Sequence, residues 1–129
     1  MMDSRDHPEI YSRRNDFNSN SHSLEEINRF LFDWLAGAET THAQVWGYHV
    51  SLGLFDLRLG KKGTDGNLHI ACASSSFMQA SMVWQNPMLR VVALNEGIAR
   101  LSLQDAVAGF RVDCDLVLLT RDVPPLFRR

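Results

Sequence analysis

The most regular hydrophobic pattern in the chain lies between residues 24 and 36. Its large apolar residues recur at intervals of three and four, which places them on one face of a helix: Leu24, Ile27, Phe30, Leu31, Trp34 and Leu35. Ser23 precedes this stripe and Glu26 follows three residues later, a spacing typical of a capping box. Gly37 supplies a stop, because glycine readily adopts the left-handed conformation at a helix end. The pattern predicts an amphipathic helix over residues 24–36.

After the helix the hydrophobic period changes to two, which is typical of strands. Apolar residues occupy mostly even positions from 44 to 54 and odd positions from 55 to 59. Gly53 lies at this switch, so we expect a bulge or a sharp bend there, or alternatively a tight hairpin around residues 51–53. In this interpretation Trp46 and Tyr48 belong to the set of side chains that point into the core.

Further strand-like segments follow at short spacing, separated by stretches rich in turn residues. They span residues 68–73, 77–84, 89–94, 98–103 and 110–118. Connections this short favour antiparallel neighbours, since a parallel crossover needs a dozen or more residues. Segment 89–94 is apolar except for Arg90, so we expect its strand to be covered on both faces.

A helix followed by strands is an α+β order. We predict a curved, mostly antiparallel sheet of six or seven strands with the N-terminal amphipathic helix packed on its concave face. A small barrel or sandwich with the helix as a plug is the alternative. The length of 129 residues suits one domain, which we place at residues 23–123. A polar tail at 1–22 precedes it, and a short tail at 124–129 follows.

Composition and charge exclude some classes of function. The formal net charge is -2, and no basic patch favours binding to nucleic acid or to an anionic membrane. The sequence has no apolar run long enough to span a bilayer and no signal peptide, which predicts a cytoplasmic protein. Cys72 and Cys114 are too few for a disulfide framework, and we expect both to be buried thiols.

Candidate catalytic residues are few. His49 or His69 could act as a general base with a carboxylate such as Asp56, as in a small hydrolase or isomerase. No nucleophile motif accompanies them, so the more conservative interpretation is that both histidines face solvent on strands.

Metal-ligand spacings are also missing from the sequence. His69 and Cys72 would point to opposite faces of a strand, which prevents them from sharing one ion. Arg111, Asp113 and Asp115 share a strand face, where two carboxylates about 7 Å apart could bind a metal, but we expect instead an ion pair between an arginine and an aspartate on a solvated surface. We therefore predict neither a metal nor a cofactor.

Thioether and indole side chains cluster late in the chain, at Met78, Met82, Trp84 and Met88. Such residues suit adaptable apolar surfaces, although they also fill cores. Together with segment 89–94, they favour a non-catalytic protein-interaction module that self-associates, with a homodimer as the expected assembly. A pocket for a small apolar ligand is the alternative, and an enzyme that uses a histidine is the second alternative.

Overall fold

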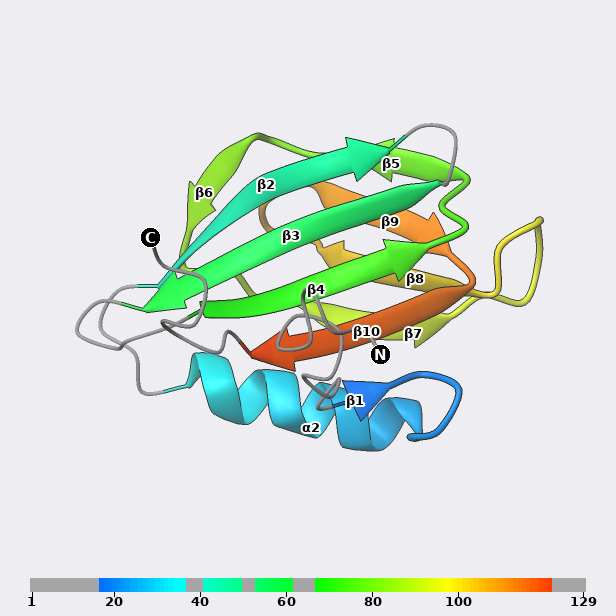
Figure 1. Ribbon diagram of the computed structural model, residues 1–129, viewed down its shortest axis with the longest axis horizontal. Coiled ribbons are helices and arrows are strands. Elements are labelled where there is room, and N and C mark those ends of the chain that lie inside the picture. The colour runs from blue at the N-terminus through cyan, green and yellow to red at the C-terminus, as the bar shows by residue number, and fades with distance from the viewer. Residues whose placement is uncertain (1–16, 37–40, 50–52, 62–66, 122–129) are drawn as a thin grey trace, which may run out of the picture.

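The computed structural model describes residues 17–36, 41–49, 53–61 and 67–121. These residues form one helix and two antiparallel sheets packed face to face as a sandwich (Figure 1). The six-stranded sheet has the order β1-β10-β4-β3-β2-β6, with β1 (Phe17–Asn18), β2 (Thr41–His49), β3 (Leu54–Lys61), β4 (Asn67–Ala73), β6 (Val83–Gln85) and β10 (Leu116–Arg121). The four-stranded sheet has the order β5-β9-β8-β7, with β5 (Phe77–Gln79), β7 (Arg90–Ala93), β8 (Leu101–Asp105) and β9 (Phe110–Cys114).

The predicted α+β class with antiparallel pairing is confirmed, but the predicted single sheet of six or seven strands is wrong. Two of the predicted segments cross from one sheet to the other. Segment 77–84 contains β5 and most of β6, while segment 110–118 contains β9 and the start of β10. Each crossing divides what the hydrophobic pattern presents as one strand.

The second crossing, at Asp115, shows why the pattern hides it. Before it, the even-numbered Val112 and Cys114 face the core; after it, the odd-numbered Val117 and Leu119 do so. A change of parity is the expected trace of such a crossing. It is invisible here because residues 116–119 are all apolar.

The change of the apolar residues from even to odd positions near Gly53 falls between the paired strands β2 and β3. The two strands pair up to His49 opposite Leu54, and Gly53, just before β3, adopts a φ of 59°; residues 51 and 52 of the tight-hairpin alternative lie outside the described residues. The bulge instead falls inside β2, between Val45 and Gly47. Because the extra residue turns Trp46 outward, its side chain is 51% exposed, and the prediction that it lies in the core is wrong.

Helix α2 (Leu24–Leu35) ends one residue before the predicted C-terminus. Both halves of the capping box are present: the Glu26 amide donates to the Ser23 hydroxyl, and the Ser23 amide donates to the Glu26 carboxylate. Gly37, the expected stop, lies outside the described residues. The last turn is tied to the six-stranded sheet by Lys61, whose Nζ donates to the Trp34 carbonyl at 3.0 Å.

The helix does not lie across the concave face of one sheet. It runs along one open side of the sandwich, next to β7 and below β10 and β1 (Figure 1), which is closer to the sandwich alternative. Ile27 and Leu31 are fully buried there. The core itself is built between the sheets, for example by the rings of Phe55 and Phe110, whose centroids are 5.8 Å apart. Strand side chains therefore fill the space that a helix across a single sheet would occupy.

Part of the segment predicted as an N-terminal tail is structured. Phe17 pairs with Leu119 of β10, and its ring packs against Phe30 of α2 at 4.7 Å. β1 thus joins the helix to the six-stranded sheet.

Candidate functional site

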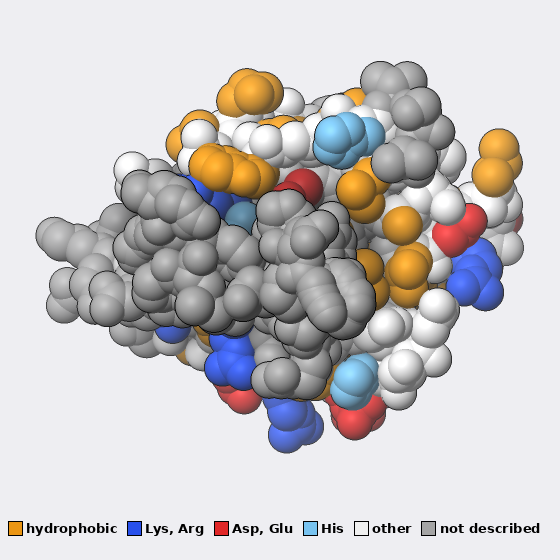
Figure 2. All heavy atoms as spheres, viewed as in Figure 1, with side chains coloured by type: hydrophobic (Ala, Val, Ile, Leu, Met, Phe, Trp, Pro, Cys, Tyr) orange, Lys and Arg blue, Asp and Glu red, His pale blue; other side chains and the backbone are white. Residues whose placement is uncertain are grey.

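The open side of the sandwich opposite α2 is formed by residues 77–83, here called the methionine edge. It consists of β5, the connection 80–82 and the first residue of β6, and all its residues are exposed. β5 and β6 are the last strands of their sheets on this side, each with one paired neighbour in the described part of the chain. Figure 2 shows hydrophobic side chains gathered over β6 and the adjoining part of β2.

The methionine edge also lacks charge. No Asp, Glu, Lys or Arg occurs between Asp65 and Arg90. Exposed edge strands are usually protected from pairing with other chains by charged residues, proline or a covering element. This edge has neither charge nor proline, and it carries the exposed large side chains of Phe77, Met78, Met82 and Val83.

The four residues predicted to form one apolar surface are separated by the structure. Met78 and Met82 lie on the methionine edge, whereas Met88 lies in the connection between β6 and β7. Trp84 is half-buried, with its ring 4.9 Å from that of Phe110 and its Nε1 donating to Asp105 at 2.9 Å. Trp84 therefore fits the alternative interpretation that these residues fill the core.

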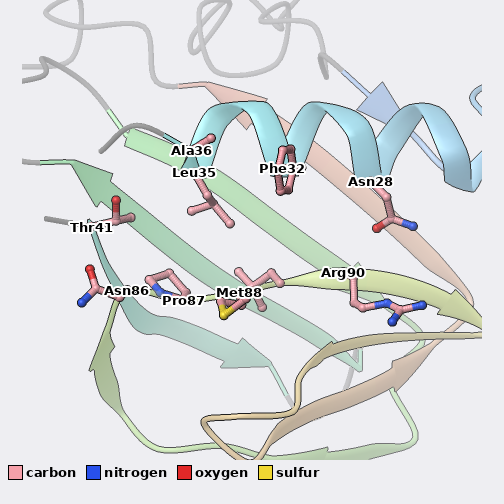
Figure 3. A pocket seen from close by; sticks show the side chains of 10 residues that line it. Asn28, Phe32, Leu35, Ala36, Thr41, Asn86, Pro87, Met88 and Arg90 are labelled. Carbon is pink, nitrogen blue, oxygen red and sulfur yellow. The ribbon is translucent and has the colours of Figure 1, made fainter. Parts of the chain in front are cut away.

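A groove of about 640 Å³ lies between the C-terminal half of α2 and residues 86–90 (Figure 3). Phe32 and Leu35 project into it from the helix, opposite Pro87 and Met88. Phe32 is 72% exposed. The volume of the groove is typical of a ligand site, and the groove is open to solvent.

The two ends of this groove are polar. At one end, Arg90 is exposed and makes no ion pair within the described residues. At the other end, Thr41 is buried, and its Oγ1 has no hydrogen-bond partner. In Figure 3 this hydroxyl points toward the C-terminal end of α2. A buried hydroxyl without a partner costs roughly 1–3 kcal/mol, so this end of the groove is incompletely satisfied.

Apart from Met88, the residues of the groove were not predicted as site residues from the sequence. Phe32 is the one position where a signal existed, because it is a large apolar residue outside the buried stripe of the helix. A solvent-facing helix position has no structural need for such a side chain. Arg90 and Thr41 carry no comparable signal, since the helix residues that face Arg90 and the Asn86 amide that bonds to the Thr41 carbonyl are distant from them in sequence.

The candidate catalytic residues lie on the outer face of the six-stranded sheet, and the structure brings two of them together. His69 Nδ1 is 3.6 Å from Asp56 Oδ1, beyond ordinary hydrogen-bond length. His49 is apart from this pair, exposed at the end of β2 opposite Leu54. The thiol nearest in sequence, Cys72, belongs to the core on the other face of β4. Cys72 therefore cannot act as a nucleophile beside the imidazole of His69 and the carboxylate of Asp56.

Arginine and tryptophan complete this face. The Arg58 guanidinium stacks on the Trp46 ring at 4.0 Å, and the Trp46 ring lies edge-on to His69 at 6.5 Å. Arg58 Nε and Asp56 Oδ1 are buried without hydrogen-bond partners. These contacts hold the exposed indole of Trp46 in place.

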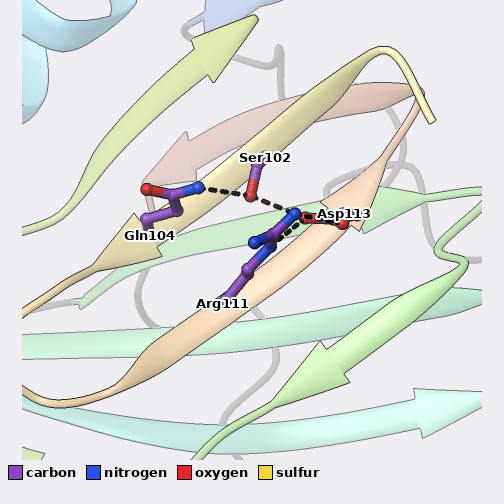
Figure 4. Close-up of polar contacts among 4 residues, drawn as sticks. All are labelled: Ser102, Gln104, Arg111 and Asp113. Atoms are coloured by element: carbon purple, nitrogen blue, oxygen red, sulfur yellow. Dashed lines mark hydrogen bonds and ion pairs between the residues drawn. The ribbon is translucent and has the colours of Figure 1, made fainter. Parts of the chain in front are cut away.

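The expected ion pair between Arg111 and Asp113 is present on the outer face of the four-stranded sheet (Figure 4). Arg111 Nε and Nη2 donate to the two carboxylate oxygens at 2.8 and 2.9 Å. The buried Ser102 hydroxyl also donates to Asp113 and accepts from Gln104. Hydrogen bonds from Arg111 and then Ser102 lower the pKa of Asp113. Because these groups satisfy one another, the network is structural.

Cys72 and Cys114 are both buried and unoxidised, as predicted. They lie in different sheets and meet across the core. The hydrogen bond between the two thiols, together with burial, raises the pKa of Cys72 well above its usual value. A protonated, inaccessible thiol is a poor nucleophile.

No group of three or more His, Cys, Asp or Glu residues suited to a metal ion occurs in the described ranges. Within the same ranges, no helix is long and apolar enough to cross a membrane. Comparison with known proteins finds no matching family, no similar curated protein and no similar solved structure.

Proposed function

We propose that this protein is a non-catalytic interaction module that self-associates through its methionine edge. The observation that carries the proposal is the unprotected edge itself: two terminal strands, one from each sheet, exposed large apolar side chains and no charge. Charged residues are depleted and methionine is enriched in the centres of protein interfaces.

A second copy of the chain is the occupant that this edge suits best. Homo-oligomers most often form symmetric dimers, in which the same surface patch faces itself. An uncharged patch can face itself without electrostatic repulsion. β6 can add backbone pairing to this contact, but with three residues it supplies few hydrogen bonds, so the methionine and valine side chains must provide most of the stabilisation.

The test compares Met82→Lys with Met88→Lys. These methionines are matched in exposure, at 68% and 67%, but Met82 lies on the edge and Met88 in the groove. We expect wild type and Met88→Lys to sediment as dimers and Met82→Lys as a monomer, because a buried, unpaired ammonium opposes association. The measurement is sedimentation velocity over a range of protein concentrations.

A second pair of variants guards against misfolding as the cause. Val83→Lys should give a monomer, whereas Val107→Lys, at an exposed turn before β9, should leave the dimer intact. At a protein concentration low enough for wild type to dissociate, all variants should have the wild-type thermal midpoint. A wild-type protein that remains monomeric at the highest concentration reached would show that the proposal is wrong, as would a dimer that both edge variants leave unchanged.

A further inference from the structure

We infer that the groove between α2 and residues 86–90 binds a small amphipathic carboxylate, such as a medium-chain fatty acid. The apolar part of the ligand lies along Phe32, Leu35 and Met88, and its carboxylate meets the guanidinium of Arg90. This site is separate from the methionine edge, and the inference does not depend on self-association.

The apolar walls argue for a ligand chain. Phe32 exposes 72% of its surface on a helix whose Ile27 and Leu31 are fully buried, and Met88 faces it across the groove. The groove's volume of about 640 Å³ accommodates a chain of moderate length. Small-molecule sites are typically concave, mostly apolar and furnished with a few polar groups that fix orientation.

The charge of the groove argues for an anion. Arg90 is the one charged residue that lines it, and no Asp or Glu lies among the lining residues. Arg90 has no carboxylate partner within the described ranges, which leaves its fork of donors available for bidentate binding. The neighbouring polar group at this end, the Asn28 amide, already bonds both the N–H and the C=O of Val91, so Arg90 is the group left to hold a carboxylate.

The opposite end supplies an independent sign that the protein alone does not complete this lining. Thr41 Oγ1 is buried there without a partner. Most buried hydroxyl groups in proteins are hydrogen-bonded, so an unpaired one in a groove wall marks a place where an ordered water can bind beside the end of the ligand chain.

The experiment uses decanoate, 1-decanol and acetate as probes of chain and charge together, chain alone and charge alone. Binding is followed by chemical-shift changes of backbone amides. We expect decanoate to shift amides of residues 32–36, 86 and 88–90, decanol to bind about tenfold more weakly and acetate not to bind. Arg90→Gln should reduce decanoate affinity to that of decanol, while Arg29→Gln, an exposed arginine outside the groove, should leave it unchanged.

The apolar contact is tested by Phe32→Ser, which should weaken decanoate and decanol alike by several-fold. Ile98→Ser is its control, since Ile98 is 88% exposed on the loop between β7 and β8. Equal affinity for decanol and decanoate, or an unchanged affinity in Arg90→Gln, would overturn the anionic assignment. Absence of decanoate binding would overturn the groove assignment.

Met82→Lys separates this inference from the proposed function. The variant should bind decanoate with wild-type affinity even when it is monomeric. If it lost decanoate binding together with dimerisation, the ligand would sit between copies at the methionine edge, and the groove assignment would be wrong.

Discussion

The two sides of the sandwich at which the sheets end differ in what covers the gap between the sheets. On one side α2 lies against β7, and its Ile27 and Leu31 side chains are completely buried between the sheets. On the other side, among the described residues, the connection 80–82 passes from sheet to sheet, and Met78 and Met82 remain exposed. The described part of the chain thus covers one gap with α2, whereas the side chains at the other gap stay exposed.

The strand edges differ in the same way. β7 ends its sheet, but the Asn28 side chain donates to the carbonyl of Val91 at 2.8 Å and accepts from its N–H at 2.7 Å. A primary amide offers both a donor and an acceptor, so Asn28 imitates one residue of a neighbouring strand. β6 has no comparable partner on its outer side in the described residues. The edge strand β7 is therefore protected by α2, and the lack of such protection at β6 supports association there.

The largest expected effect comes from breaking the closed side. Leu31→Ala should lower the free energy of unfolding by roughly 2–5 kcal/mol, because it removes fully buried methyl groups and leaves a cavity. Met82→Ala should change the stability of the monomer by less than about 0.5 kcal/mol, since an exposed side chain has little packing to lose. Urea denaturation at low protein concentration measures both.

The same two variants should show the opposite order of effects on self-association. Met82→Ala should weaken the dimer, and Leu31→Ala should leave the dimer of its folded fraction intact. Similar losses of stability in the two variants would mean that Met82 is part of the monomer core and that the two sides are closed alike.

An intermediate effect is expected from exposing the protected edge. Asn28→Ala leaves the N–H and C=O of Val91 without their partner, at a cost of roughly 1–3 kcal/mol in the free energy of unfolding. It also opens β7 to pairing with another chain, so we expect species larger than a dimer in light scattering. Arg29→Ala, the neighbouring exposed helix position, is the control for helix propensity. A stable, strictly dimeric Asn28→Ala protein would show that Asn28 does not guard this edge.

The closed side was largely predictable from the sequence because its determinants are local. Ser23 and Glu26 are three residues apart, and the buried stripe recurs every three or four residues, so a short window contains both the start of the helix and its inner face. Where the helix would lie was not predictable. Its position depends on Asn28 meeting Val91 and on Lys61 meeting Trp34, contacts that no short window of sequence contains.

The open side was predictable only in composition. The cluster of methionine and tryptophan side chains in residues 78–88 suggested an apolar surface, but the division of segment 77–84 between two sheets was hidden by its regular alternation. The same applies to the candidate catalytic pair. Asp56 and His69 come together because β3 and β4 are neighbours in a particular register. Neither the neighbour nor the register can be predicted from the alternation within a single strand.

The smallest expected effect is a difference in acid sensitivity between the two sides. The backbone hydrogen bond from Ser23 lowers the pKa of Glu26, so this carboxylate is more acidic in the folded protein than in the unfolded chain. Its stabilisation of α2 is therefore fully present above the unfolded value of about 4.3 and is lost as the pH falls through the lower folded value. The methionine edge carries no carboxylate and should not respond in that window.

Amide hydrogen exchange measured from pH 5 to pH 3 distinguishes the two sides. After correction for intrinsic rates, protection of the first turns of α2 should fall while that of β6 holds. Glu26→Gln, which keeps an acceptor for the Ser23 amide but cannot titrate, should flatten the response of α2, whereas Glu25→Gln should not. Equal loss of protection in α2 and β6 would indicate global acid unfolding, in which case the capping carboxylate does not set the acid limit of the helix side.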